Sequence, residues 1–524
     1  MSFSEPPDDQ RFNFNQISHL SRPFLPWWSG DIEAELGPTS FQQHKSTLCE
    51  SCENITLAAL ESQQGYMHDG KALEQSAQAS NACGLCFLIR DALISAHEEF
   101  GTLHETEKAL SDVLKRANQR VKLSAMAKTD ISIGLDPPHR DFPDLATLSL
   151  YTTPGSPSAG LTDHFTKCTT DNEAVYLAAH WISQCFISHP KCPKAIEVPL
   201  PKRLIDVGPS NSAPSLRLWK NPCYSTARDK YDAPLTGTYL ALSYCWGLSP
   251  FTVLSPQNQE MMEQEIEMSL LPKTIQDAIR ITRLLHVRFL WVDSLCILQG
   301  SSSEAQEDWK EQSLQMAAIY QQAALTIGAS TSEGAHDGIK HFEKYKGCFV
   351  KLPTSWSSLV SHNPMYVGPN AHSLAFPFHR KLHTRAWTHQ ERLLSTRYIT
   401  FGQGGMLWEC AQARIADNAQ DLDYSYDRRS LAIRLPSTPT YIDWHHIVAD
   451  YSTMELTRSS DKLVAIASLR EQFMQLRSNQ DLDVAGLWAD NLSWDMLWQR
   501  ALFVPDATPH AKGCIAPTWS WASM

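Results

Sequence analysis

The pattern of hydrophobic and polar positions changes near residue 239, and the part of the chain before that point predicts mainly helices and loops. Residues 1–45 are expected to form a flexible lead-in, and residues 46–235 a helical N-terminal region. Within that region, positions 46–125 mix polar and apolar residues as helices do. Positions 126–172 are rich in Pro, Ser, Thr, Asp and Gly, which predicts a long surface loop.

The N-terminal region is expected to end with a helix and a short β-hairpin. The helix is predicted over Asn172–Phe186. Two short apolar runs, Leu200–Val207 and Leu216–Trp219, predict the hairpin. This hairpin leads into the part of the chain where the pattern changes.

From Tyr239 onward, short apolar runs rich in strand-forming residues alternate with helical patterns. The predicted strands are Tyr239–Tyr244, Arg288–Ile297, Leu325–Ala329, Arg397–Phe401 and Met406–Glu409, and the predicted helices are Pro272–Val287, Glu307–Ala324 and Thr384–Ser395. An irregular insertion is expected over 331–380. This alternation is typical of an α/β domain with a mostly parallel sheet, which we place at residues 236–412. Residues 413–524 are expected to form a mainly helical, mixed region that packs back on this core.

Composition narrows the class of protein. The chain has 524 residues, of which 43% are hydrophobic and 19% charged, so it can bury a sizeable core. Its net charge of −12 argues against nucleic acid as a partner, because nucleic-acid binding needs a basic face. No uncharged apolar run is long enough to predict a membrane span, and the N-terminus lacks the features of a secretory signal. We therefore expect a cytoplasmic protein whose 13 cysteines are free thiols or metal ligands.

Two pairs of cysteines near the N-terminus suggest a metal site. Cys49 and Cys52 form one Cys-x-x-Cys pair, and Cys83 and Cys86 form the other. Four thiolates in two such pairs can make a closed tetrahedral zinc site, so zinc is a candidate cofactor. The alternative is that these cysteines are buried in helices, which the apolar residues after Cys86 favour.

A second group with ligand-forming side chains occurs at the end of the helix predicted over Asn172–Phe186. Cys185, His189 and Cys192 follow Trp181 at short spacings. A closed zinc site needs four ligands, and no fourth occurs nearby at a suitable spacing. The sequence therefore favours packing at a helix end over a metal site.

Polar side chains follow two of the predicted strands at the edge where an α/β sheet binds ligands. Ser243, Tyr244 and Trp246 end the first strand, and Asp293 follows Phe-Leu-Trp-Val in the second. These residues are candidate ligand contacts. The alternatives are an aromatic residue that packs at the strand end, and an aspartate that caps the loop after residue 293.

Trp387 and Glu391 lie four residues apart on a predicted helix and therefore share one face. An indole beside a carboxylate suits a site that stacks a flat ring and stabilises a positive charge. The alternative is a core tryptophan, with Glu391 paired to Arg385 or Arg392. Spacing alone favours this alternative.

Five sequence blocks in fixed order resemble the heterokaryon incompatibility (HET) domain of filamentous fungi. The blocks are Leu242–Gly247, Leu271–Ala278, Trp291–Gln299, Met316–Ala323 and Arg385–Ser395, and the resemblance covers about 239–410. It implies a TIR-like (flavodoxin-like) α/β fold and a role in fungal nonself recognition and regulated cell death. It also implies partners of two kinds, namely further copies of the chain or another incompatibility protein.

The same resemblance implies a chemistry for the site. Some TIR relatives cleave the nicotinamide–ribose bond of NAD with a glutamate on the helix after the third strand, which implies a catalytic role for Glu391 and NAD as substrate. Ser243, Tyr244, Trp246, Asp293 and Trp387 would then be ligand contacts. Leu298 departs from the family pattern, which usually has a polar residue there, and this argues against a polar contact from its loop. The alternative is a non-enzymatic, self-assembling signalling module.

Overall fold

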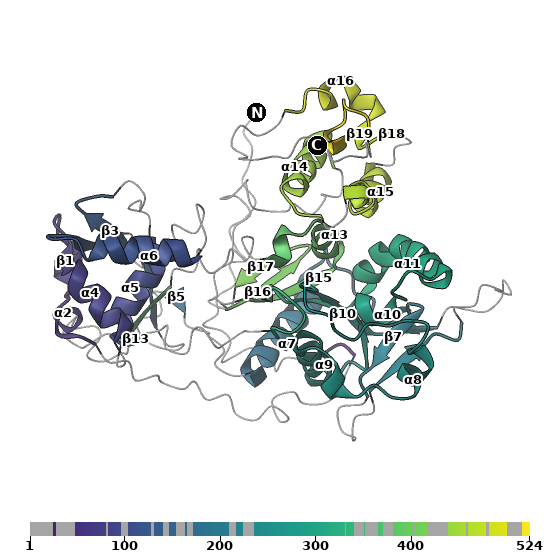
Figure 1. Cartoon of the computed structure of the whole chain (residues 1–524), viewed down its shortest axis with the longest axis horizontal. Coiled ribbons are helices and arrows are strands. Elements are labelled where there is room, and N and C mark those ends of the chain that lie inside the picture. Colours follow the sequence, from purple (N-terminus) through teal and green to yellow (C-terminus); the bar gives the residue numbers. More distant parts are fainter. Residues whose placement is uncertain are drawn as a thin grey trace.

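The structure is a computed structural model, and Figure 1 shows how its elements are arranged. The residues that it describes are 25–27, 48–79, 82–95, 103–126, 130–139, 146–152, 163–164, 171–208, 216–223, 235–330, 332–339, 350–351, 365–369, 381–402, 405–416, 439–456, 459–477, 481–499 and 516–523. Two bodies are visible, one built from the first third of the chain and a larger one from most of the rest. Each has its own hydrophobic core. Of residues 1–45, only 25–27 lie inside the described ranges.

The N-terminal body combines helices with an antiparallel sheet. Its helices are α2 (Glu50–Glu53), α3 (Leu57–Glu61), α4 (Gly70–Gln78), α5 (Gly84–Ser95) and α6 (Leu103–Leu114). Its strands are β1 (Tyr66–Asp69), β2 (Arg120–Met126), β3 (Asp130–Asp136), β4 (Ala146–Thr152) and β5 (Asp163–His164). The sheet follows the order β1-β2-β3-β4, antiparallel throughout this run.

The long surface loop expected over 126–172 is therefore wrong for the described part of that stretch, and so is a mainly helical N-terminal flank. Residues of β3 alternate between buried and half-buried positions, with Ile131, Ile133 and Leu135 facing the core. This period of two is the signature of a strand with one face buried. The turn-forming residues around β3 are more numerous than the strand residues, which is why composition alone suggested a loop.

The expected insertion at 331–380 also contributes to the N-terminal sheet. Strands β13 (Val350–Lys351) and β14 (Met365–Pro369) pair with each other, and β14 pairs antiparallel with β4. Val350 and Val367 are buried in the N-terminal core. The rest of 340–380 lies outside the described residues. Two segments far apart in the sequence thus complete one sheet.

The larger body is built on an eight-stranded sheet with the order β17-β16-β15-β12-β10-β11-β7-β8. The strands are β7 (Arg203–Asp206), β8 (Arg217–Lys220), β10 (Tyr239–Ser243), β11 (Phe289–Trp291), β12 (Leu325–Gly328), β15 (Arg397–Gly402), β16 (Gly405–Cys410) and β17 (Arg414–Ala416). The four central strands, β15, β12, β10 and β11, are parallel, and the pairs at both edges are antiparallel. The predicted α/β class and the hairpin of β7 and β8 are confirmed, but the sheet is parallel only at its centre.

Helices surround this sheet. They are α7 (Asp171–Ser188), α8 (Gln259–Gln264), α9 (Lys273–Leu284), α10 (Asp293–Cys296), α11 (Ser303–Gln322) and α13 (Ala386–Leu394). Helix α9 begins after Pro272, as the sequence predicts, and buries Ile275, Ala278 and Ile279. The second parallel strand ends earlier than expected, at Trp291. None of the helices in the described ranges combines the length and the apolar composition that crossing a bilayer would need.

The C-terminal residues share the core of the eight-stranded sheet. Helices α14 (Tyr441–Ser452), α15 (Ala467–Arg477) and α16 (Leu492–Asp495) lie here with the short strands β18 (Asp483–Val484) and β19 (Leu487–Trp488). Phe473 stacks on Trp488 with ring centroids 5.0 Å apart, and Trp444 meets Trp488 edge-on. These rings belong to the same hydrophobic core as the parallel strands. Burial of such large rings holds this region against the sheet.

Candidate functional site

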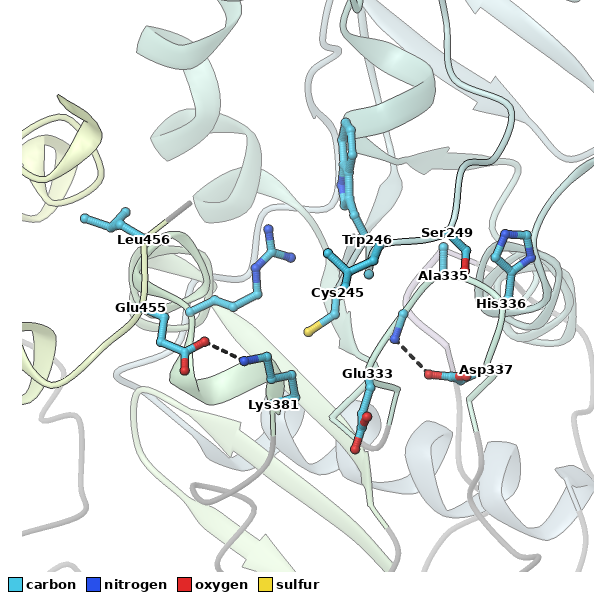
Figure 2. Close-up of a pocket in the computed structure, with 14 residues that line it drawn as sticks. Cys245, Trp246, Ser249, Glu333, Ala335, His336, Asp337, Lys381, Glu455 and Leu456 are labelled. Carbon is cyan, nitrogen blue, oxygen red and sulfur yellow. Dashed lines mark hydrogen bonds and ion pairs between the residues drawn. The ribbon is translucent and has the colours of Figure 1, made fainter. Parts of the chain in front are cut away.

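A cavity of about 720 Å³ opens where the chain leaves the carboxyl ends of β10 and β12. Residues 245–249 follow β10, and residues 333–337 follow β12. Lys381 and Arg385 precede α13, and Glu455 and Leu456 follow α14. Figure 2 shows these side chains around the opening. The chain leaves β10 toward β11 on one side and leaves β12 toward β15 on the other side. The cavity therefore lies at the position where α/β sheets bind ligands.

The two strand-end loops approach closely on one side of the cavity. Gly247 has φ +74, and a Cβ there would lie 2.7 Å from the Cα of Gly334. Ala335 donates a backbone hydrogen bond to the Trp246 carbonyl at 3.1 Å. Glycine is required at 247 because another residue would be strained and would collide with the neighbouring backbone.

Charged side chains line the cavity. Lys381 pairs with Glu455, and the Asp337 carboxylate accepts a hydrogen bond from the Gly334 amide at 2.8 Å (Figure 2). Glu333 also lines the cavity, so the lining carries acids and bases together. Such a lining can bind a polar ligand that carries both charge and hydrogen-bonding groups.

Ser243 and Glu391, two predicted site residues, are in direct contact with each other, close in the sequence to the cavity-lining Cys245 and Arg385. Ser243 ends β10, and its hydroxyl donates a hydrogen bond to Oε2 of Glu391 at 2.5 Å. Both residues are buried, with exposed fractions of 1% and 7%. Burial raises the pKa of Glu391 from 4.5 to about 7, because the charged form loses its hydration, while the Ser243 bond acts in the opposite direction. A carboxyl group with such a pKa can exchange a proton near neutral pH.

Trp246 and Asp293 are also brought together. The indole N–H of Trp246 donates to Asp293 Oδ2 at 2.9 Å, and the Ser294 amide donates to Oδ1 at 2.6 Å. Burial raises the pKa of Asp293. Asp293 is the first residue of helix α10 rather than part of a strand, and Val292 stands at the N-cap position.

The two remaining predicted ligand contacts, Tyr244 and Trp387, do not line the cavity. The Tyr244 hydroxyl is 2.7 Å from the Ser294 hydroxyl, and burial raises the pKa of Tyr244 well above its usual value. Trp387 is half-buried and packs against the main core. Of the six predicted catalytic and ligand-binding residues, only Trp246 is among those that line the cavity.

Arg385 is the most informative site residue that sequence reasoning did not select. Its guanidinium donates to the Tyr244 carbonyl at 3.0 Å and also lines the cavity. Its charge lowers the pKa of both Asp293 and Glu391, against the effect of burial. Arg392, the other proposed partner of Glu391, makes a two-point contact with Glu409 at 2.6 Å. The sequence block Arg385–Ser395 pointed to Arg385 as a site residue. Only the fold shows that its guanidinium contacts the Tyr244 carbonyl.

The four N-terminal cysteines come together as the sequence suggested. The Sγ atoms of Cys49, Cys52, Cys83 and Cys86 all lie within 4.8 Å of one another. Cys86 Sγ is 3.6 Å from that of Cys49 and 3.5 Å from that of Cys52. In a tetrahedral zinc–thiolate site, sulfur atoms are about 3.8 Å apart, given Zn–S bonds of about 2.3 Å. A hydrogen bond from Cys52 lowers the pKa of the Cys83 thiol. The donor set and its spacing therefore fit zinc.

Comparison with known proteins gives one result that bears on the site. Residues 239–391 match the family model described as Heterokaryon incompatibility protein (HET). The matched segment begins with the first residue of β10 and ends with Glu391. Neither the curated proteins nor the solved structures gave a significant match. The match supports a HET domain in this part of the chain.

Proposed function

We propose that this chain is a HET-domain protein of fungal nonself recognition and regulated cell death, and that it cleaves NAD at the cavity beside Trp246. The observation that carries the proposal is the Ser243–Glu391 contact, a buried carboxyl group of raised pKa bonded to the end of the strand whose following residues line the cavity. Ser243 is two residues from Cys245, and Cys245 lines the cavity. The HET match over the same strands and helix supports this assignment.

The arrangement of the sheet supports a TIR-like core as part of the proposal. The four parallel strands follow one another in the chain as β10, β11, β12 and β15. Across the sheet they lie in the order β11-β10-β12-β15, so the second strand comes first and the first strand lies beside the third. Flavodoxin-like sheets have this order and bind ligands between the first and third strands. The cavity is bordered by the segments after β10 and β12, which are the first and third strands here.

The proposed reaction needs little from the protein beyond charge and position. The bond between the ribose carbon and the nicotinamide nitrogen breaks, and its electron pair goes to the nitrogen. Water forms the new carbon–oxygen bond and releases a proton. Ionised Glu391 would stabilise the positive charge that develops on the ribose. Arg385 and Lys381 line the cavity, and in this proposal they would bind the phosphates.

One observation favours the alternative of a non-enzymatic, self-assembling signalling module. Glu391 is 7% exposed, and its carboxylate is bonded to Ser243 rather than lining the cavity. In that alternative, the contact joins α13 to β10 and does no chemistry. Catalysis requires Glu391 to turn toward the cavity, and the Ser243 bond must break for that to happen.

Nicotinamide release separates the two functions. The purified full chain is incubated with NAD, both alone and after forced oligomerisation. We expect wild type to release nicotinamide and Glu391→Gln to release at least 100-fold less, at equal thermal stability. Glu307→Gln, on the exposed face of α11, is the matched control and should behave as wild type. No release by wild type in either state would reject the enzymatic proposal. Cell death that persists in Glu391→Gln would favour the signalling module.

A further inference from the structure

The larger body holds a second group of metal-ligating side chains, separate from the N-terminal cysteines. Cys185 lies in the last turn of α7, His189 and Cys192 follow it, and Cys410 ends β16. One ligand atom from each of these four residues lies within 4.8 Å of the other three. The fourth ligand missing from the local sequence is thus Cys410, which lies 221 residues after His189.

We propose that Cys185, His189, Cys192 and Cys410 bind a structural zinc ion. Three thiolates and one imidazole form one of the common closed zinc sites. All four side chains are buried, and the Cys410 Sγ lies 3.2 Å from His189 Nδ1. Neighbouring ligand atoms around tetrahedral zinc are about 3.5 to 3.8 Å apart, so an ion fits with small side-chain shifts.

The loop that carries two of the ligands is already shaped for this site. The Cys192 amide donates to the His189 carbonyl at 3.1 Å, which forms a tight turn between them. Lys194 Nζ donates to the same carbonyl at 2.8 Å and to the Cys185 carbonyl at 2.7 Å. The turn therefore directs both side chains to one point, with no dependence on the metal.

Neighbouring groups donate hydrogen bonds to two of the sulfur atoms. The Arg397 Nε donates to Cys185 Sγ at 3.3 Å, and the Ala413 amide donates to Cys410 Sγ at 3.3 Å. Sulfur accepts hydrogen bonds better as a thiolate than as a thiol. Donors of this kind orient and stabilise the ligands of metal sites.

Arg397 gives an independent reason to expect negative charge here. Its side chain is 1% exposed, and its position in β15 is paired with Cys410 in β16. Arg397 contacts carbonyl oxygens, Cys185 and the Phe186 ring, and no ion pair found within the described ranges involves it. A buried cation without a counter-charge is costly. Zinc with three thiolates and a neutral histidine carries a single net negative charge, which supplies the missing partner.

Apolar packing and a disulfide both account for less of the arrangement than zinc does. A metal-free arrangement, in which Cys410 and His189 share only a hydrogen bond, leaves Arg397 with no negative counter-charge among the described residues. A disulfide needs two sulfur atoms about 2.05 Å apart, and all the described cysteines are free. The site has four protein ligands and no open position, so we assign it a structural role.

The ion would join parts of the chain that lie on either side of the HET match. Residues 185–192 come before the matched segment 239–391, and Cys410 comes after it. Helix α7 packs against β16 in the same place. Zinc would therefore close the chain around the eight-stranded sheet at the edge formed by β16 and β17. Zinc binding here does not depend on the proposed enzymatic function.

Metal analysis of the full-length protein tests the site. We expect purified wild type to retain zinc, and Cys410→Ser to contain about one equivalent per chain less. Cys296→Ser is the matched control, because Cys296 is buried and free but lies in neither cysteine group. It should match wild type. Equal zinc in Cys410→Ser and wild type would overturn the proposal, and so would wild type that takes up no zinc after reduction.

A second pair of variants tests zinc binding if Cys410→Ser does not fold. His189→Cys keeps four ligands and should retain the zinc content of wild type. His189→Phe fills similar space with no ligand and should contain about one equivalent less. Equal metal content in these two variants would refute a role for residue 189 as a ligand. Circular dichroism confirms that the compared samples are folded.

Discussion

Ser243 and Glu391 are 148 residues apart in the sequence, yet a hydrogen bond of 2.5 Å joins them in the core. The bond connects the end of the first parallel strand to the helix that carries the proposed catalytic carboxyl group. Both partners are almost fully buried. The contact therefore contributes to the stability of this region, and it lowers the pKa of Glu391 against the larger effect of burial.

Removal of the Ser243 hydroxyl should destabilise the protein. In Ser243→Ala, the buried carboxyl group of Glu391 loses a partner, which costs about 1–3 kcal/mol in the free energy of unfolding. Urea denaturation measures the change. Ser452→Ala is the control, because its hydroxyl lies on the exposed surface of α14, and we expect a change below about 0.5 kcal/mol. Equal stability of the two variants would mean that the Ser243–Glu391 hydrogen bond makes no net contribution to the free energy of unfolding.

The ionisation of Glu391 should make stability depend on pH. Its pKa is about 7 in the folded chain, against an ordinary value of 4.5, so between these values the folded state binds more protons than the unfolded state. Stability therefore falls as pH rises from 4.5 to about 7, and this group contributes up to about 3 kcal/mol of that loss. Glu391→Gln does not titrate. We measure the free energy of unfolding of both proteins at pH 4.5 and pH 8. As pH rises, wild type should lose stability relative to Glu391→Gln. An equal difference between the two proteins at both pH values would contradict the raised pKa.

The buried pair of Arg392 and Glu409 should be far more important for stability than an exposed pair. The two side chains make a two-point contact, and Arg414 lies 3.4 Å from the same carboxylate. Glu409→Gln removes the negative charge of a buried carboxylate that contacts two guanidinium groups, and we expect a loss of about 3–5 kcal/mol. Glu455→Gln removes the exposed pair with Lys381 and should cost less than about 1 kcal/mol. Thermal and urea unfolding of both variants provide the comparison.

The N-terminal cysteine group should hold zinc through Cys86, which contacts two of its other members. Cys86→Ser should reduce the zinc content by about one equivalent per chain and lower the melting temperature, because closed zinc sites contribute directly to folding. Cys223→Ser is the control, since Cys223 is free and outside the group. Unchanged metal content in Cys86→Ser would leave packing in the core as the role of these cysteines.

Local signals allowed much of the larger body to be predicted. The strand that ends at Ser243 and helix α9 appear as expected, because short apolar runs and helical periodicity depend only on neighbouring residues. The N-terminal sheet was missed because β3 lies among turn-forming residues. A strand of this kind is stabilised by pairing with distant segments, which its own sequence does not specify.

The sequence by itself determined the order of the four parallel strands β10, β11, β12 and β15, the HET resemblance, and which side chains have the chemistry to act. Only the tertiary structure decided their partners. It placed Arg385 on the Tyr244 carbonyl and Glu455 at the cavity, and it brought Cys410 to Cys185 and His189. The physical reason is that hydrogen bonds, ion pairs and metal ligands depend on distances in space. Those distances are set by sheet pairing and burial across hundreds of residues.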